Sequence, residues 1–208
     1  MNVAGPIAKA AAVAASAFLT PVEAKIPAAP ANTVTCNSPV GPRDSARSLL
    51  RRFGKQARIE RVAHSEDEPG RVLVLYPLDP SRRLVVTYFD NALRDPAQIV
   101  AAGRQSGWLF DGLKMGDSIE RVVEANGKHF DLWGFDWEQG GDIQNWGEGG
   151  ALASHEAQCA LSVKFGPSVT GELPGGMTGQ VTLRSDQPQV RALRLEVVEM
   201  SMNLPGEP

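Results

Sequence analysis

The sequence predicts an α+β fold, in which an antiparallel sheet carries helices on one face. Two short helix signals, at 44–55 and 117–128, share a polar cap, an apolar stripe and a glycine stop. Strand-like segments follow these helices without long parallel crossovers. The composition, 42% hydrophobic and 22% charged over 208 residues, is that of a globular protein. We expect two tandem helix-plus-hairpin units, over 44–115 and 116–208, either separate or merged into one compact domain.

The first residues have the composition of an export signal. Lys9 precedes an alanine-rich apolar stretch over 10–19, and the Val-Glu-Ala sequence at 22–24 supplies the small residues that signal peptidase requires. We expect 1–24 to be a signal peptide and the mature chain to be periplasmic or secreted. The alternative is an amphipathic or disordered tail. The apolar stretch is too short to cross a bilayer and no other segment is long enough, so we expect a protein that is not membrane-spanning.

The net charge bears on the kind of partner, and the cysteines bear on the cellular compartment. The formal net charge is −3, and no concentrated basic face favours nucleic acid as a partner. Cys36 and Cys159 are the only cysteines, and two thiols in an exported chain are usually joined. We predict that they form a disulfide. Closing so long a loop stabilises the folded state by roughly 4–5 kcal/mol in the chain-entropy model.

The elements follow in order. Residues 25–43 are an N-terminal arm, because their four prolines disfavour both a helix and a central strand. The first helix, over 44–55, has apolar residues at helical spacing and ends at Gly54, which suits a left-handed stop. Its apolar stripe consists of Ala46, Leu49, Leu50 and Phe53. The opposite, basic face consists of Arg47, Arg51 and Arg52. Such a face is usually a solvated helix surface, and its functional alternative is contact with an acidic partner or an anionic envelope component.

The remaining elements are mainly strands. Residues 72–76 and 84–89 flank a proline-containing turn and predict a hairpin. In the second helix we expect Asp117 to be the N-cap and Glu120 to complete a capping box. Later strand predictions cover 160–165, 181–183 and 191–198. A connection rich in glycine and proline joins the first two of these, over 166–179.

The segment over 126–150 is unusually rich in tryptophan and glycine. An Asn-Gly-Lys helix end is followed by a Phe, a Gly-Phe pair, a Gly-Gly pair, and a Trp close to another Gly-Gly. From about Trp108 to Leu161 the chain resembles a family of uncharacterised exported bacterial proteins, which implies no particular activity. The chain differs at His129, where such sequences usually have proline, and at 138–139, where an Asp-Tyr step is commoner. The tandem arrangement is also similar to the β-lactamase-inhibitor-protein architecture and to small outer-membrane assembly lipoproteins.

The aromatic residues of this segment are the candidate binding residues. If 133–137 is a strand, Trp133, Phe135 and Trp137 share one face. We expect at least two of these three aromatics to belong to the core, and Trp146 to be the best candidate for exposure. Their alternative role is a recognition platform, because tryptophan is enriched among binding hot spots. The candidate binding set is Trp133, Trp137, Trp146 and Asp136.

Motifs for catalysis, metals and cofactors are missing from the sequence. The acidic residues between 131 and 142 do not have EF-hand spacing, and the three histidines at 64, 129 and 155 do not have zinc-site spacing. We predict no metal and no cofactor. There is no P-loop, nucleophile elbow or Ser-x-x-Lys motif. We therefore expect a non-catalytic binding or envelope-associated module whose partner is a protein or envelope component. The alternatives are a hydrolase-type enzyme with an unrecognised site and a structural envelope-assembly protein.

Overall fold

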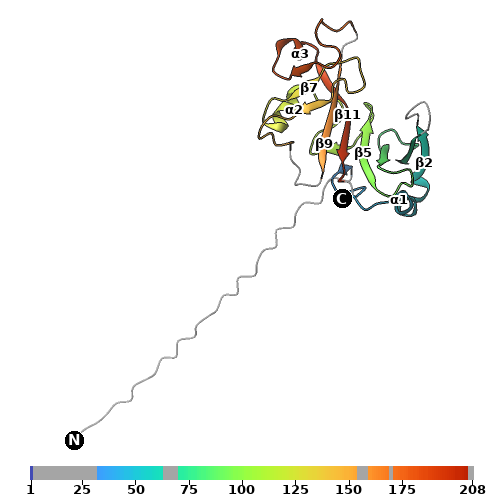
Figure 1. The fold of residues 1–208 in the computed structure, drawn as a ribbon. Coiled ribbons are helices and arrows are strands. Elements are labelled where there is room, and N and C mark those ends of the chain that lie inside the picture. The colour runs from blue at the N-terminus through green and yellow to red at the C-terminus, as the bar shows by residue number, and fades with distance from the viewer. Residues whose placement is uncertain (2–31, 63–69, 154–158, 169–170, 206–208) are drawn as a thin grey trace.

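A six-stranded antiparallel sheet dominates the structure (Figure 1). The computed structural model describes residues 1, 32–62, 70–153, 159–168 and 171–205. The predicted signal peptide over 1–24 lies outside these residues. The sheet has the order β2-β3-β4-β5-β11-β9. Its strands are β2 (Ala57–Val62), β3 (Gly70–Leu75), β4 (Leu84–Tyr88), β5 (Pro96–Ala102), β11 (Leu195–Asn203) and β9 (Ala160–Pro167). The predicted α+β class with an antiparallel sheet is confirmed.

The C-terminal strand joins the two halves of the chain. β11 pairs with β5 on one side and with β9 on the other, so that Met200 lies between Ala101 and Val163. One continuous sheet therefore extends across both predicted units. Within it the predicted hairpin is confirmed, because β3 and β4 pair antiparallel with Leu73 opposite Val86.

Two smaller sheets complete the strands. In one, β1 (Thr33–Val34) pairs parallel with β6 (Leu109–Phe110), which holds the N-terminal arm against the body of the protein. The other has the order β10-β7-β8. Its strands are β10 (Thr182–Arg184), β7 (Asp131–Trp133) and β8 (Ile143–Asn145).

The two main helices begin in the same way. α1 (Ala46–Phe53) has Ser45 as its N-cap, with φ −72° and ψ 158°, and α2 (Ile119–Asn126) has Ser118, with φ −73° and ψ 161°. Each serine Oγ accepts a backbone N–H from three residues later, at 3.2 Å in α1 and 3.3 Å in α2. The prediction of Asp117 as the second N-cap is wrong, because its carboxylate accepts the N–H of Lys114 at 2.9 Å instead.

The helices end differently. Gly127 adopts the left-handed conformation that stops α2, with φ 68° and ψ 1°. Gly54 has φ 53° but ψ −124°, and the chain continues into a 3₁₀ turn, η1 (Gly54–Gln56). The left-handed stop predicted there is therefore wrong. The strand predicted over 191–198 also begins late, because α3 (Pro188–Ala192) comes before β11 and starts with a proline, which suits a first helical turn.

One hydrophobic cluster forms the core. It combines alternate residues of the six-stranded sheet with the apolar sides of α1 and α2, including Leu49, Val122, Phe110 and Phe165. No helix among the described residues is long and apolar enough to cross a membrane.

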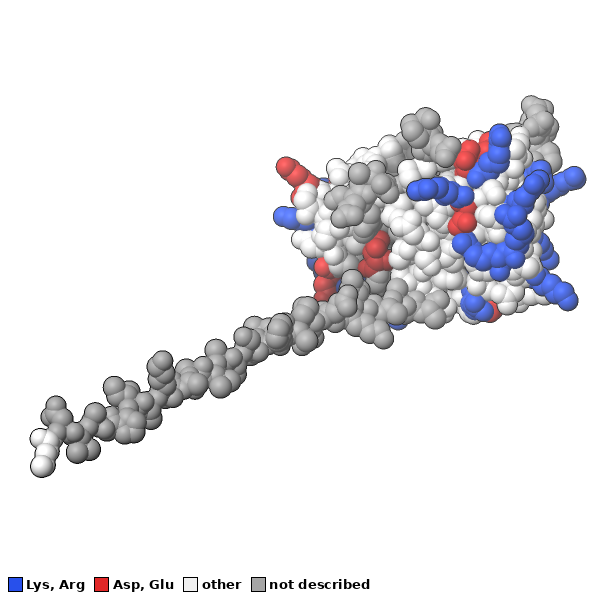
Figure 2. All heavy atoms as spheres, turned by 90° about the horizontal axis from the view of Figure 1, so that it is seen from below, with Lys and Arg blue, Asp and Glu red and all other residues white. Residues whose placement is uncertain are grey.

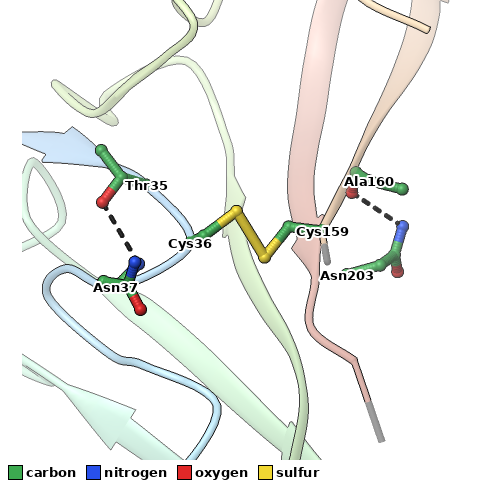
Figure 3. Close-up of a disulfide and its surroundings, with 6 residues drawn as sticks. All are labelled: Thr35, Cys36, Asn37, Cys159, Ala160 and Asn203. Carbon is green, nitrogen blue, oxygen red and sulfur yellow. Dashed lines mark hydrogen bonds between the residues drawn. A yellow bond between two sulfur atoms is a disulfide. The ribbon is translucent and has the colours of Figure 1, made fainter. Parts of the chain in front are cut away.

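The predicted disulfide is present. Cys36 in the arm is bonded to Cys159 just before β9, with their Cα atoms 5.9 Å apart (Figure 3). Their separation of 123 residues means that the bond joins the beginning of the described chain to the second half of the sheet. Such a bond is consistent with an oxidising environment outside the cytoplasm.

Candidate functional site

A groove lined by arginines runs along α1. Its volume is about 410 Å³, and we call it the arginine groove. It is lined by Ala46, Arg47, Leu50, Arg51, Ile59, Arg71, Ala92 and Leu93. A neighbouring hollow of about 550 Å³ shares three of these residues and adds Ser45 and Arg94. Together the two hollows follow α1 from its N-cap, Ser45, to Arg51 in its second turn.

The groove exists because α1 covers only part of the sheet. Leu73 is fully buried in the core cluster with the apolar side of α1. Ile59 is paired with Leu73 in the ladder and so shares its sheet face, yet it is 37% exposed. Arg71 lies two residues before Leu73 on the same face. The sheet edge thus extends past the helix and leaves an apolar floor beside a cation.

Helical periodicity supplies the opposite wall. Arg47 and Arg51 are one turn apart on α1 and both are exposed, while Ala46 and Leu49 turn into the core. The floor between the walls is recessed, because Ala46 and Leu93 are each only 3% exposed. The groove therefore combines a buried apolar bottom with exposed guanidinium groups.

The predicted basic face divides into two parts. The guanidinium of Arg52 already has partners within the protein, because its Nη2 lies 2.7 Å from the carboxylate of Asp44 and 2.8 Å from the carbonyl of Pro39. In contrast, Arg47 and Arg51, together with Arg71, have no ion-pair or hydrogen-bond partner for their guanidinium groups among the described residues. Among the residues that the structure describes, these three positive charges therefore line one groove without an acidic partner.

Two nearby arginines, in contrast, are paired with a carboxylate. Arg58 and Arg83 both contact Glu60, at 2.7 Å and 3.0 Å. The hydrogen bond from Arg83, more than that from Arg58, lowers the pKa of this carboxyl. Figure 2 shows the basic side chains gathered at the end of the molecule formed by α1 and β2, while most of the remaining surface in that view is uncharged.

One charge of α1, that of Arg47, opposes the helix dipole. The positive end of a helix dipole favours acidic residues, yet the first turn of α1 has no acidic residue and contains Arg47. α2 has Glu120 at the equivalent place after its serine cap, and Glu124 where α1 has Arg51. Arg51, in the last turn of α1, suits the negative end of the dipole, so among the arginines of the groove it is Arg47 that helix stability does not explain.

The tryptophans are arranged differently from the prediction. Trp146 is half-buried and packs on the core, with its ring 5.7 Å from that of Phe130 and its Nε1 donating to the carbonyl of Leu161 at 3.4 Å. Trp133 and Trp137 are half-buried too, but they contact each other edge to face at 5.4 Å and are not part of the core cluster. Of these three tryptophans, Trp146 is therefore the one that packs against the core.

The chain beyond Trp133 does not continue as a strand. β7 ends at Trp133, and Asp136 has φ 63°, so that the expected alternation is wrong. Phe135 turns inward and is 5% exposed, whereas Asp136 is exposed. Trp137 Nε1 donates to the carbonyl of Gly134 at 2.8 Å, which uses its polar atom within the turn. Within the candidate set, Trp133 and Trp137 contact each other beside Asp136, whereas Trp146 packs against Phe130 on the core.

A histidine and a serine lie together near α2. His129 Nδ1 is 3.2 Å from Ser185 Oγ, and both residues line a hollow of about 200 Å³ with Glu120 and Arg191. Ser185 is only 3% exposed and its Oγ accepts the backbone N–H of Phe130 at 3.0 Å, while the histidine is exposed. A nucleophilic serine needs an accessible oxygen. Here the serine is buried and the histidine is exposed, so the pair does not have the geometry of a catalytic dyad.

The acidic residues that the structure describes form no metal-binding cluster. No group of three or more possible metal-binding side chains occurs in the described part of the chain. Asp142 is paired with Lys164 at 3.6 Å, and burial raises the pKa of this carboxyl. His64 and His155 lie outside the described residues.

Comparisons with family models, with curated proteins and with solved structures found no match to this chain. The site is therefore interpreted from its own geometry. Sequence analysis identified Arg47 and Arg51 through helical spacing, but it missed Arg71, Arg94 and Ile59. These come from other segments and have no local signal that links them to α1.

Proposed function

We propose that this protein is a non-catalytic binding module of the cell envelope or extracellular space, and that the arginine groove holds an anionic partner. The observation that carries the proposal is the set of Arg47, Arg51 and Arg71, which lack acidic partners among the described residues and surround an apolar floor. Guanidinium groups with free donors bind carboxylates and phosphates through paired hydrogen bonds. The location outside the cytoplasm is supported by the disulfide and by the signal predicted over 1–24.

We further propose that 44–115 and 116–208 are related units. The matching serine caps, and the antiparallel strand pairs that follow α1 and α2, support this relationship. The charges of the two helices are reversed at equivalent positions, so the anionic partner belongs to the first unit alone. A binding test can therefore use the second unit as an internal comparison.

The proposal is tested by measuring calorimetric binding of a polyglutamate peptide to the full mature chain at low and high salt. The wild type should bind, and binding should weaken as salt rises because salt screens exposed charges. R47Q/R51Q should lose binding. The matched control is R104Q/R184Q, which removes two exposed arginines outside the groove. Equal binding by both double variants would show that only net charge matters and would contradict the proposal.

The hydrolase alternative draws on one specific contact, between His129 and Ser185. If it were correct, the wild type would hydrolyse an activated ester, and both S185A and H129Q would abolish that turnover. We expect no turnover above the S185A variant, because the hydroxyl is buried and already accepts a backbone N–H.

A further inference from the structure

We infer that the partner held by the arginine groove is an extended acidic segment of another protein, in which an apolar residue separates two acidic residues. This inference rests on the proposed function and names the chemistry of its ligand. It is drawn from the composition of the groove, from the spacing of its charges and from its shape.

The composition of the groove favours a ligand that has both negatively charged and apolar groups. Arg47, Arg51 and Arg71 provide cations, but the surface between them consists of Leu50 and Ile59 together with small apolar residues. An inorganic anion would satisfy the arginines and leave the apolar surface in water. A ligand with both carboxylate and apolar groups covers both, and burying the apolar surface adds favourable free energy.

The spacing of the arginines matches an extended chain. Residues four apart on a helix rise by about 6 Å along its axis. Alternate residues of an extended chain are about 6.6 Å apart and point to the same side. Two acidic residues at i and i+2 can therefore meet Arg47 and Arg51 in turn. The residue between them then faces the sheet edge, where Ile59 and Arg71 lie.

The shape of the groove favours a chain over a membrane surface. The floor at Ala46 and Leu93 is 3% exposed and lies below the exposed arginines, so a flat layer of lipid headgroups would touch the guanidinium groups without reaching it. Side chains of a peptide can enter the hollow. The two joined hollows, of about 410 and 550 Å³, also have room for several residues rather than one small anion.

The experiment compares four probes on the full mature chain by calorimetry and co-sedimentation. The first is a peptide of alternating Glu and Val, and the second has Ser in place of every Val. The third is inorganic phosphate, and the fourth is vesicles of phosphatidylglycerol and phosphatidylcholine, with pure phosphatidylcholine as their control. We expect the Glu-Val peptide to bind at least about tenfold more tightly than the Glu-Ser peptide and phosphate, a difference that calorimetry resolves.

Variants test the charged contact and the apolar contact separately. R47Q/R51Q should weaken the Glu-Val peptide about tenfold or more, while R104Q/R184Q should leave it unchanged. I59S should weaken the Glu-Val peptide but leave the Glu-Ser peptide unchanged, because it removes only apolar contact. Thermal unfolding of each variant checks that it is folded, and I59S alters a residue that is already 37% exposed.

The outcomes separate this inference from the proposed function. One informative result is that vesicles or phosphate bind through Arg47 and Arg51 as tightly as the Glu-Val peptide, and another is that both peptides bind equally. Either result would contradict the inference of an extended apolar-acidic ligand but would leave the proposed anion-binding function standing. If none of the four probes binds at low salt, both the inference and the proposed function are overturned.

Discussion

Arg47 occupies on α1 the position that Glu120 occupies on α2. Each is the second residue after a serine N-cap, and the two caps have nearly the same backbone angles. The positive end of the helix dipole stabilises the glutamate and destabilises the arginine. Such a reversal within one chain supports the proposal that Arg47 serves a contact outside the helix, since residues that oppose local stability often belong to binding sites.

Reversing this charge should stabilise the protein. We expect R47E to raise the free energy of unfolding by roughly 0.5–1 kcal/mol, because it favours the helix dipole and removes repulsion with Arg51. The reciprocal variant, E120R, should lower it by a similar amount. Urea unfolding at low salt measures both changes. A lower stability of R47E would mean that Arg47 supports the fold, and the helix-dipole support for the arginine groove would be lost.

The disulfide should contribute a large part of the stability. Replacing both cysteines, in C36S/C159S, frees a loop of 123 residues in the unfolded chain. We expect a loss of roughly 3–5 kcal/mol in the free energy of unfolding. Denaturant unfolding of the variant, and of the wild type with and without reductant, provides the measurement. An unchanged midpoint on reduction would contradict the prediction.

Asn126 should be the most sensitive polar residue of the glycine-rich segment. It is 1% exposed, and its side chain donates to the carbonyls of Trp146 at 2.7 Å and Lys128 at 3.0 Å while it accepts the N–H of Leu152 at 3.0 Å. N126A leaves these buried groups without partners, so we expect a loss of about 2–4 kcal/mol.

The control for this prediction is N145A. Asn145 is exposed and its side chain accepts one backbone N–H, from Gly147 at 2.9 Å. We expect this variant to lose about 1 kcal/mol or less. Similar losses in the two variants, measured by the same thermal unfolding, would show that Asn126 does not organise the segment.

Glu199 should make stability depend on pH. It is half-buried on β11, and burial raises the pKa of its carboxyl, opposed by Lys164 and assisted by Asp142. An acid whose pKa is raised on folding binds more protons in the folded state, so its contribution falls as the pH rises from the ordinary Glu value of 4.5 through the raised value.

E199Q should therefore be more stable than the wild type at neutral pH, and this gain should disappear in acid, where the wild-type carboxyl is protonated. E196Q is the control, because Glu196 lies on the same strand and forms an ion pair with the exposed Arg104 at 2.9 Å. Unfolding curves from acid to neutral pH distinguish the two. A gain for E199Q that is constant with pH would rule out titration as its cause.

Much of the secondary structure was predictable because its signals are local. The apolar stripe of the first helix, the hairpin of β3 and β4, and the apolar alternation of Leu161, Val163 and Phe165 all follow from short-range spacing. The wrong predictions occur where a turn decides the geometry. Asp136 takes a positive φ and ends the alternation after Trp133, which no pattern of apolar residues indicates.

The sequence by itself determined the α+β class, the presence of the two short helices, the pairing of Cys36 with Cys159 and the candidate arginines of α1. Each depends on periodicity, on composition or on there being one possible cysteine pair. Only the tertiary structure decided that β11 lies between β5 and β9, and that Arg71 and Ile59 face α1 across a groove. Contacts between segments far apart in the chain depend on which strands pair and how far a helix covers their face, and a local pattern contains neither.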